Sequence, residues 1–311
     1  MKEHKGANSF ISERQTVVTI GTFDGVHAGH RSIIERLVNS ANANNLDSVV
    51  LTFFPHPRMV LQKESGLQLI NTIEERKKLL EQTGIDHLVI HPFTHQFSRL
   101  TALEFVRDIL VNKLKAKKII IGYDHRFGRN RTADINDLKQ FGKDFDFEVE
   151  EISQQDVEKV AVSSTKIRNA LLEGRVERAN LYLKSSFTLN GAIVKGRGIG
   201  KELGFPTANL EITEDYKLIP KNGVYVVRTK IDGASVNGMM NIGTNPTVGG
   251  KEKTIESYFF NLDKDLYGKQ LEIELLVRIR DEKKFTSVDD LKIAMKQDQA
   301  FSKQYLKDNH A

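Results

Sequence analysis

The sequence contains no cysteine, which excludes disulfide bonds, iron–sulfur clusters and zinc sites with thiolate ligands. It also lacks any apolar run near the ~18 residues that a membrane-spanning helix needs. Residues 1–14 are polar and lack the apolar core of a secretory signal peptide. There is no internal repeat and no low-complexity segment. These absences indicate an ordinary globular protein that does not enter a membrane, and we expect it in the cytoplasm.

The charge balance is slightly basic, with 46 Lys and Arg against 41 Asp and Glu and a net charge of +5. Such a balance fits either a nucleic-acid binder or an enzyme that handles phosphorylated metabolites. The basic residues are scattered among acidic ones, without a basic tail or a repeated basic–aromatic pattern. This distribution favours small polyanionic ligands over nucleic acid, and it leaves the oligomeric state open.

The first 180 residues alternate between strand-like and helix-like segments. Thr72 with Glu75, and Thr101 with Glu104, have the spacing of a helix capping box. Alternation of strands and helices predicts an α/β fold with a mostly parallel, Rossmann-like sheet covered by helices. Alternating apolar residues at 145, 147 and 149 predict a further strand at the edge. The other strands are expected at residues 16–21, 48–54, 87–90 and 118–122.

The second part of the chain, from about Ser186, has a different composition and pattern of apolar residues. Glycines become frequent, and residues 271–279 alternate between apolar and polar as in a half-buried antiparallel strand. The Asp232-Gly233 pair predicts a turn between two strands, and a helix follows Thr286. We therefore predict a small antiparallel β-barrel with a C-terminal helix. Because 311 residues suggest about two domains, we divide the chain into domains 1–184 and 185–311.

The string GTFDGVHAGH, residues 21–30, follows an apolar strand directly. Its glycines permit a tight turn, and a helix that begins near His27 would present free backbone N–H groups to a phosphate. His27 and His30 share one face of that turn and could donate hydrogen bonds to charge developing on an α-phosphate. The pair could also ligate zinc, although no third ligand is evident nearby, or lie on the surface without a role. The glycines and the preceding strand favour phosphate chemistry.

Three other segments of this half also follow strands or precede a helix. In VSSTKIR, residues 162–168, Ser164 or Thr165 could cap a helix that runs to Gly174; alone, this is an ordinary cap with a solvated arginine. GYDHRFGRNR, residues 122–131, could stack a ring and hold a phosphate, or be a basic surface turn. PHPR, residues 55–58, could line the same pocket.

A glycine-rich string, KGRGIGKELGFPTAN, occupies residues 195–209. It is not a P-loop, because no glycine lies five residues before Gly200 and Glu202 stands where Ser or Thr should follow the lysine. It also fails the dinucleotide-binding pattern. Such a loop could still offer its amides to phosphate, and Thr207 and Asn209 provide oxygen ligands that suit Mg²⁺. Taken alone, it could equally be a mobile surface loop.

The motifs of the first half resemble the HxGH nucleotidyltransferases, and GTFDGVHAGH resembles their bacterial FAD synthetase branch. Residues 162–168 are similar to the SSTxIR motif of that family, with Val162 where Ile is common. Residues 122–128 resemble its GxDFRFG flavin loop, with His125 in place of Phe. The resemblance implies catalysis by His27 and His30 and flavin binding by Asp124 and Phe127. It implies ATP and phosphate binding by Gly21, Phe23, Asp24, Gly25, Gly29, Ser164, Thr165 and Arg168.

The second half resembles riboflavin kinase through its GxGxxxGFPTAN string. Further segments match that family in order, at residues 222–225, 241–247, 255–258, 265–268 and 278–285. The resemblance implies a Greek-key barrel in which Glu256 is the catalytic base, although a carboxylate at such a position is often only an exposed strand residue. Asn261 departs from the Asp often found there. The resemblance also implies phosphate binding by Gly196, Gly198, Gly200 and Pro206, Mg²⁺ binding by Thr207 and Asn209, and flavin binding by Arg280.

Together the two halves resemble the bacterial bifunctional riboflavin kinase/FAD synthetase family. The resemblance implies ATP-dependent phosphorylation of riboflavin to FMN, then transfer of an adenylyl group from ATP to FMN to give FAD and pyrophosphate, with Mg²⁺ in both steps. Two alternatives remain open. One is an adenylyl- or cytidylyltransferase for another substrate, such as pantetheine phosphate, fused to an unrelated barrel. The other is a nucleic-acid-binding module.

Overall fold

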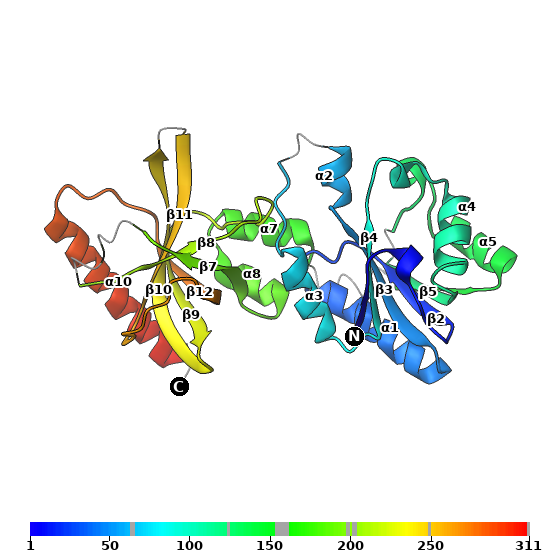
Figure 1. Cartoon of the computed structure of the whole chain (residues 1–311), viewed down its shortest axis with the longest axis horizontal. Helices are drawn as coiled ribbons and strands as arrows, with labels where there is room; N and C mark the ends of the chain where they lie inside the picture. The colour runs from blue at the N-terminus through cyan, green and yellow to red at the C-terminus, as the bar shows by residue number, and fades with distance from the viewer. Residues whose placement is uncertain are drawn as a thin grey trace. The chain divides into compact units, whose positions relative to one another are not determined.

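The computed structural model describes residues 1–62, 66–122, 125–152, 162–196, 200, 204–247 and 250–309, without the side chains of 245–247 and 250–252. The chain forms two compact units, Met1–Ser164 and Thr165–Ala311. Figure 1 shows a helix-covered sheet in the first and a barrel in the second. Each unit is described by itself.

The first unit is built on a six-stranded sheet with the order β1-β4-β3-β2-β5-β6. Every strand pair in it is parallel. The chain moves outward from β2 through β3 to β4 and then returns to the other side of β2 as β5, so the order reverses between β2 and β5. Ligands of such sheets bind at the carboxyl ends of the strands at this reversal. The elements are β1 (Lys2–His4), η1 (Ala7–Ser9), β2 (Thr16–Ile20), α1 (Ala28–Asn44), β3 (Asp47–Phe54), α2 (Pro57–Leu61), α3 (Ile73–Glu81), β4 (His87–Pro92), η3 (Phe97–Arg99), α4 (Ala102–Glu104), the π-helical η4 (Phe105–Val111), β5 (Ala116–Gly122), η5 (Arg129–Arg131), α5 (Ile135–Phe145) and β6 (Glu148–Ile152).

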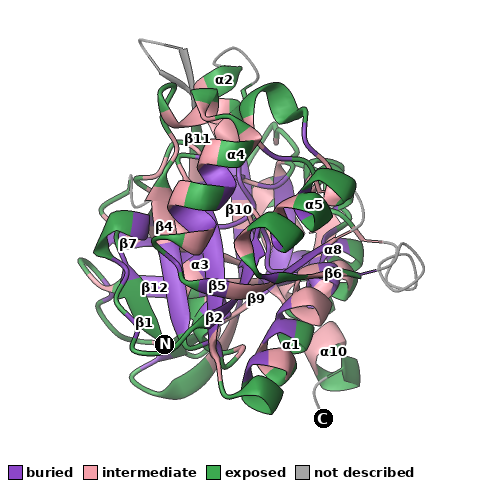
Figure 2. Ribbon diagram, turned by 90° about the vertical axis from the view of Figure 1, so that its right-hand side faces the viewer, coloured by how far each residue is buried: buried purple, intermediate pink, exposed green. Residues whose placement is uncertain are grey.

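Both faces of this sheet are covered, so β2 is buried along its whole length and β3 along all but its two end residues (Figure 2). Val17 of β2 packs with Ile34 of α1 on one face. Its neighbour Val18 packs with Phe105 of η4 on the other. Strands buried on both faces read as continuous apolar runs, which is why β2 and β3 could be predicted from composition alone.

Two predicted helix starts in this unit are confirmed, and one predicted strand start is wrong. Thr72 and Thr101 each form a complete capping box with the glutamate three residues on. The edge strand β6 begins at Glu148 rather than Phe145. Phe145 belongs instead to α5, where it lies near Phe141 one turn earlier, and the left-handed residue Asp146 ends that helix.

The second unit is a closed antiparallel barrel with the strand order β10-β11-β8-β7-β12-β9. Asp232 and Gly233, both with positive φ, form the predicted turn between β9 and β10. Burial alternates along β7, as expected for strands with one face in the core. The predicted fold class is thus confirmed for both halves. The elements are α7 (Ser164–Leu172), α8 (Val176–Leu183), β7 (Phe187–Val194), β8 (Ala208–Glu211), β9 (Gly223–Ile231), β10 (Ala234–Thr247), β11 (Gly250–Phe259), β12 (Gln270–Arg280) and α10 (Val288–Asn309).

Two helices that precede the barrel in sequence, α7 and α8, form hydrogen bonds with it. The Asn180 side chain of α8 donates a hydrogen bond to the carbonyl of Leu275 at 2.9 Å and accepts one from the Phe187 backbone at 2.7 Å. On α7, the Leu171 carbonyl accepts a hydrogen bond from the backbone of Lys221. The second compact unit therefore includes α8 and all of α7 except Ser164. The domain boundary predicted at 184/185 would instead place both helices in the first domain. That boundary stays a prediction.

Candidate active sites

The loop between β2 and α1 is a compact turn with unusual backbone angles. Phe23, Gly25 and Val26 all have positive φ, at 48°, 90° and 37°. The Val26 N–H donates to the Phe23 carbonyl at 3.1 Å. Positive φ is rare for a β-branched residue and persists only where the surrounding structure enforces it, as it commonly does at functional sites. This loop ends at the sheet edge where the strand order reverses.

The two histidines of this loop stack on each other. Their ring centroids are 3.6 Å apart with an interplanar angle of 16°. His27 caps α1: its Nδ1 accepts a hydrogen bond from the His30 backbone at 3.4 Å. In neutral His27 this bond leaves the proton on Nε2, which then is a donor. Gly29, buried between them in the first turn of α1, completes the HxGH pattern at a helix N-terminus, where anions bind favourably.

His30 is held in its neutral form. Burial lowers the pKa of its ring well below the ordinary value, and the nearby His27 and Arg76 lower it further. Its Nδ1 is buried and has no hydrogen-bond partner among the described residues. Phe23 lies against its ring edge-on at 5.1 Å. A neutral imidazole can donate a hydrogen bond to developing negative charge, as an oxyanion donor does.

Asp24 lies beneath the loop rather than on its surface. Its carboxylate is fully buried and accepts hydrogen bonds from the backbones of Ile70 at 3.1 Å and Asn71 at 3.2 Å. It also lies 3.8 Å from the guanidinium of Arg76, which is itself fully buried. Arg76 could not be predicted as a site residue from the sequence, because a lone arginine on a charged helix carries no local signal of burial. This geometry indicates that Asp24 ties the loop to the start of α3.

The SSTxIR segment straddles the division between the units. The Ser164 hydroxyl donates to the Asp24 carbonyl at 2.9 Å, which connects this motif to the histidine loop. Ser164 is already the first residue of α7, so the expectation that Ser164 or Thr165 precedes and caps this helix is wrong. Thr165 and Arg168 lie in the first turns of α7. Their roles toward ATP stay predictions.

The predicted flavin loop follows β5, the strand next to β2. Asp124 lies outside the described residues. Phe127 is 7% exposed and packs with Phe105 in the core, with His125 stacked against it at 6.2 Å. After the neighbouring β3, His56 is buried, and its Nδ1 caps α2 by accepting from the Arg58 backbone at 3.1 Å. These contacts give Phe127 and His56 structural roles at the same sheet edge.

In the barrel, a polar row crosses three neighbouring strands. Glu256 of β11 pairs in register with Asn209 of β8 on one side and with Asn241 of β10 on the other. Residues directly opposite in antiparallel strands share one face. The Thr207 hydroxyl donates to the Glu256 carboxylate at 3.3 Å. The structure thus brings Thr207, Asn209 and Glu256 together, and it adds Asn241.

The glycine-rich loop is shaped by close approaches. A Cβ on Gly196 would lie 2.0 Å from the Asn209 amide, so only glycine leaves room for that side chain. A Cβ on Gly200 would lie 2.4 Å from the Phe205 carbonyl. Phe205 is buried with its ring edge-on to Tyr258, and the exposed Pro206 follows it. Gly198 lies outside the described residues.

These oxygen groups fit a magnesium ion. Mg²⁺ takes few protein ligands, usually one or two carboxylates, and completes its coordination with water and phosphate oxygens. Thr207 and Asn209 offer one hydroxyl and one amide oxygen beside the Glu256 carboxylate, and water and phosphate oxygens would complete the coordination. Among the described residues, no group of three or more His, Asp or Glu could hold a metal by itself.

The Arg280 guanidinium is bound by a carboxylate of the same chain. Its guanidinium binds both carboxylate oxygens of Asp298 on α10, at 2.7 to 3.2 Å, and lies 5.8 Å from the Phe285 ring. Asp298 is 4% exposed. Arg280 therefore fixes α10 against β12, and a direct contact with flavin stays a prediction.

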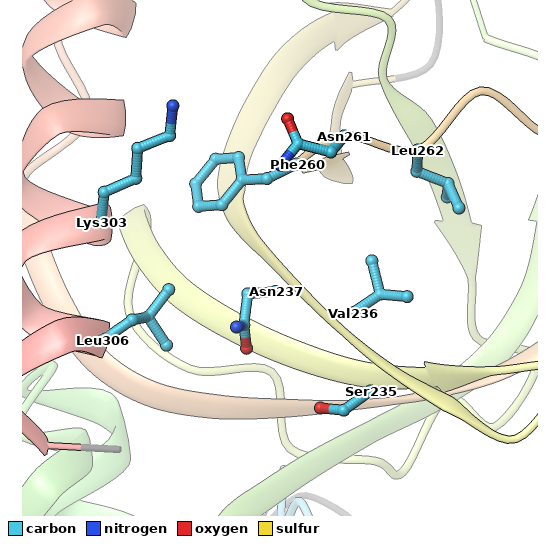
Figure 3. Close-up of a pocket in the computed structure, with 8 residues that line it drawn as sticks. All are labelled: Ser235, Val236, Asn237, Phe260, Asn261, Leu262, Lys303 and Leu306. Atoms are coloured by element: carbon cyan, nitrogen blue, oxygen red, sulfur yellow. The ribbon is translucent and has the colours of Figure 1, made fainter. Parts of the chain in front are cut away.

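A surface hollow of about 520 Å³ lies between β10, the end of β11 and α10 (Figure 3). Phe260 and Lys303 face each other across it, with the ammonium 5.8 Å from the ring centroid. Its lining contains none of the predicted site residues, so it is separate from the row around Glu256.

Comparison with known families gives one match in each half of the chain. The FAD synthetase family matches residues 10–166, and the riboflavin kinase family matches residues 183–306. A solved structure titled as a macrolide-efflux protein from Streptococcus pneumoniae matches with a TM-score of 0.88 and 33% identity, over 97% of this chain and 98% of that one. No described helix of the present chain is long and apolar enough to cross a membrane.

Curated relatives match along almost the whole length. Proteins named bifunctional riboflavin kinase/FMN adenylyltransferase are 35% identical in Buchnera aphidicola from Schizaphis graminum, covering 93% of this chain and 94% of the relative. The protein of that name from Escherichia coli K12 is 32% identical, covering 93% and 92%. In Listeria monocytogenes the values are 35% identity, 91% and 90%. The chain therefore belongs to the bifunctional riboflavin kinase/FMN adenylyltransferase family.

Proposed function

We propose that this chain makes FMN from riboflavin at the barrel and FAD from FMN at the α/β unit, with the residues described above in separate roles. The observation that carries this proposal is the presence of two separate polar clusters on two different folds. One combines stacked imidazoles with a helix N-terminus at the reversal point of the sheet. The other is the row around Glu256. The ligands are small molecules, and we propose neither a nucleic-acid nor a membrane partner.

At the barrel, Glu256 accepts the proton of the terminal ribityl hydroxyl. The hydroxyl oxygen forms a bond to the γ-phosphorus of ATP while the bond from that phosphorus to the β–γ bridging oxygen breaks, and ADP leaves. The hydrogen bond from Thr207 orients the carboxylate. Thr207 and Asn209 would hold Mg²⁺, which would neutralise phosphate charge when bound. ATP phosphates are bound by the glycines at 196, 198 and 200 and by Pro206.

At the α/β unit, a phosphate oxygen of FMN forms a bond to the α-phosphorus of ATP while the bond from that phosphorus to the α–β bridging oxygen breaks, and pyrophosphate leaves. His27 and neutral His30 donate hydrogen bonds to the charge that develops on the α-phosphate and the leaving oxygen. The amides at the start of α1 face the same charge. Ser164, Thr165 and Arg168 bind ATP phosphates, and Asp124 binds flavin.

Two variants separate the activities in one experiment. The purified chain is incubated with ATP and Mg²⁺ and either riboflavin or FMN, and the flavins are separated by chromatography over time. Glu256→Gln keeps the size of the side chain but cannot accept the proton, so FMN formation should fall by about 10²–10⁴-fold while supplied FMN still becomes FAD. His30→Ala should lower FAD formation by about 10²–10³-fold and spare FMN formation.

The outcomes decide each role. Kinase turnover of Glu256→Gln within about threefold of wild type is too small a loss for a general base and removes Glu256 from that role. Equal loss of both activities in folded His30→Ala indicates a structural role instead. A wild-type chain that turns over neither flavin contradicts the proposed function as a whole.

A further inference from the structure

Glu282, two residues beyond the end of β12, binds two other segments of the barrel at once. Its Oε1 accepts a hydrogen bond from the Thr244 backbone N–H at 3.2 Å. Its Oε2 accepts one from the Asn222 side chain at 3.0 Å. Asn222 also donates to the Thr244 hydroxyl at 2.7 Å, so the three residues form a closed set of contacts.

The Glu282 carboxylate binds β10 at a position that β9 does not reach. β9 begins at Gly223, which pairs with Ile242, whereas β10 continues to Thr247 along β11. Beyond Ile242 the edge of β10 has no described strand partner on the β9 side. A backbone N–H at such an edge needs an acceptor, and Glu282 supplies it to Thr244.

The contact requires the glycine at position 243. A Cβ there would lie 2.6 Å from the Glu282 Oε1 and 3.1 Å from the Asn241 amide nitrogen. The Glu282 carboxylate and the Asn241 side chain therefore lie side by side over Gly243. Asn241 is directly opposite Glu256 on β11, so Glu282 extends the row around the proposed base.

The neighbouring residue strengthens this attachment from the same side. Asp281 pairs with Arg278 at 2.7 Å and with Lys221 at 3.0 Å. Two successive carboxylates after β12 thus hold the two residues that precede β9. The segment that follows, 283–287, leads to α10.

We propose that Glu282 is a positioning residue of the kinase site: it anchors the segment after β12 to the unpaired end of β10 and so fixes Asn241 and, across the strands, Glu256. This inference rests on the proposed role of the barrel in riboflavin phosphorylation. It predicts that loss of the carboxylate lowers turnover more than riboflavin affinity, because the reacting groups are displaced while most binding contacts stay.

The test compares full-length wild type with Glu282→Ala, Glu282→Gln and a matched control. FMN formation gives kcat and KM, riboflavin fluorescence gives Kd, and FAD formation from FMN monitors the other unit. Glu274→Gln is the control, because Glu274 is an ion-paired carboxylate on β12 that binds Arg228 at 2.7 Å. We expect Glu282→Ala to lower the kinase kcat by about tenfold to a hundredfold, the range for misplaced reacting groups. FAD formation and the control should stay within about twofold of wild type, since neither involves this contact.

The conservative variant distinguishes positioning from folding. Glu282→Gln keeps one oxygen for the Thr244 N–H and should recover part of the lost kcat. A Glu282→Ala protein with kinase kcat within about twofold of wild type overturns the proposal. So does a loss of thermal stability without a change in kcat.

If Glu282→Ala does not fold, Gly243→Ala tests the same contact without removing the charge, because its methyl group displaces the carboxylate. Normal kinase turnover in Gly243→Ala then overturns the proposal. A wild-type chain without kinase activity overturns the proposed function itself, a result distinct from normal turnover in the variants.

Discussion

Replacement of Asp24 by asparagine tests how the histidine loop is held. The Asp24 carboxylate is fully buried, accepts two backbone hydrogen bonds and lies 3.8 Å from the buried guanidinium of Arg76. Asparagine has the same size but one acceptor oxygen and no charge, so it retains at most one of the two bonds. Removal of one partner from a buried ion pair costs about 3–5 kcal/mol. We expect the free energy of unfolding of the first unit to fall by about that amount.

The two activities make this loss measurable in the intact chain, because each reports on one unit. In a urea series, FAD formation by Asp24→Asn should disappear at a lower urea concentration than in wild type, by roughly 2 M at a typical slope of 1–3 kcal/mol per M. FMN formation should disappear at an unchanged concentration. Asp108→Asn is the control: its ion pair with Arg107 is half exposed, and such pairs contribute little.

A direct role of Asp24 toward ATP predicts a different result. The variant would then resist urea like the wild type, and its KM for ATP in FAD formation would rise. That combination refutes the assignment of Asp24 to the support of the loop.

Two further predictions concern His30 and the domain boundary. The folded-state pKa of His30 is lowered, so in mild acid the unfolded chain binds a proton at this side chain more readily than the folded chain. The free energy of unfolding should therefore fall as the pH drops from about 6.5 toward the lowered pKa, by at most about 1.4 kcal/mol per pH unit. Thermal unfolding of His30→Gln should therefore depend less on acid than that of wild type, and equal slopes would contradict the assignment. A fragment of residues 165–311 should phosphorylate riboflavin and make no FAD, and it should melt higher than 185–311, which lacks the Asn180 contacts to the barrel. Equal melting temperatures would contradict a role of α7 and α8 in the barrel unit, and an inactive, folded fragment of either length would contradict the modular function.

The fold could be predicted because its signals are local. β2 and β3 are continuous apolar runs, and the capping boxes at Thr72 and Thr101 lie within four residues of sequence. The histidine pair is likewise contained in one turn, so its stacking at a helix N-terminus follows from its spacing. The start of β6 was misplaced because Phe145 fits a strand alternation and a helix face equally well, and contact with the α5 turn decides between them.

The supporting residues could not be predicted, because their partners are distant in sequence. Nothing near Asp24 indicates that its carboxylate turns inward to Ile70 and Arg76 rather than outward to a phosphate. Arg280 has the same ambiguity, and only the position of Asp298 on α10 shows that its guanidinium is already bound. A motif identifies residues that a site requires, but it does not separate those that touch the ligand from those that hold the loop.

Both sites use a carboxylate to hold a neighbouring segment in place, by accepting hydrogen bonds from backbone N–H groups. Asp24 accepts backbone N–H groups of a segment that precedes α3, and Glu282 accepts a backbone N–H of β10 beyond the end of β9. In each case regular secondary structure leaves a backbone donor without a partner beside the reacting groups, and a buried or anchored carboxylate binds it. The Asp24 carboxylate is fully buried and also lies beside the Arg76 guanidinium, whereas Glu282 is exposed and the two groups that donate to it are neutral. Loss of Asp24 should therefore appear first as instability of its unit, and loss of Glu282 as slower turnover in a chain that remains folded.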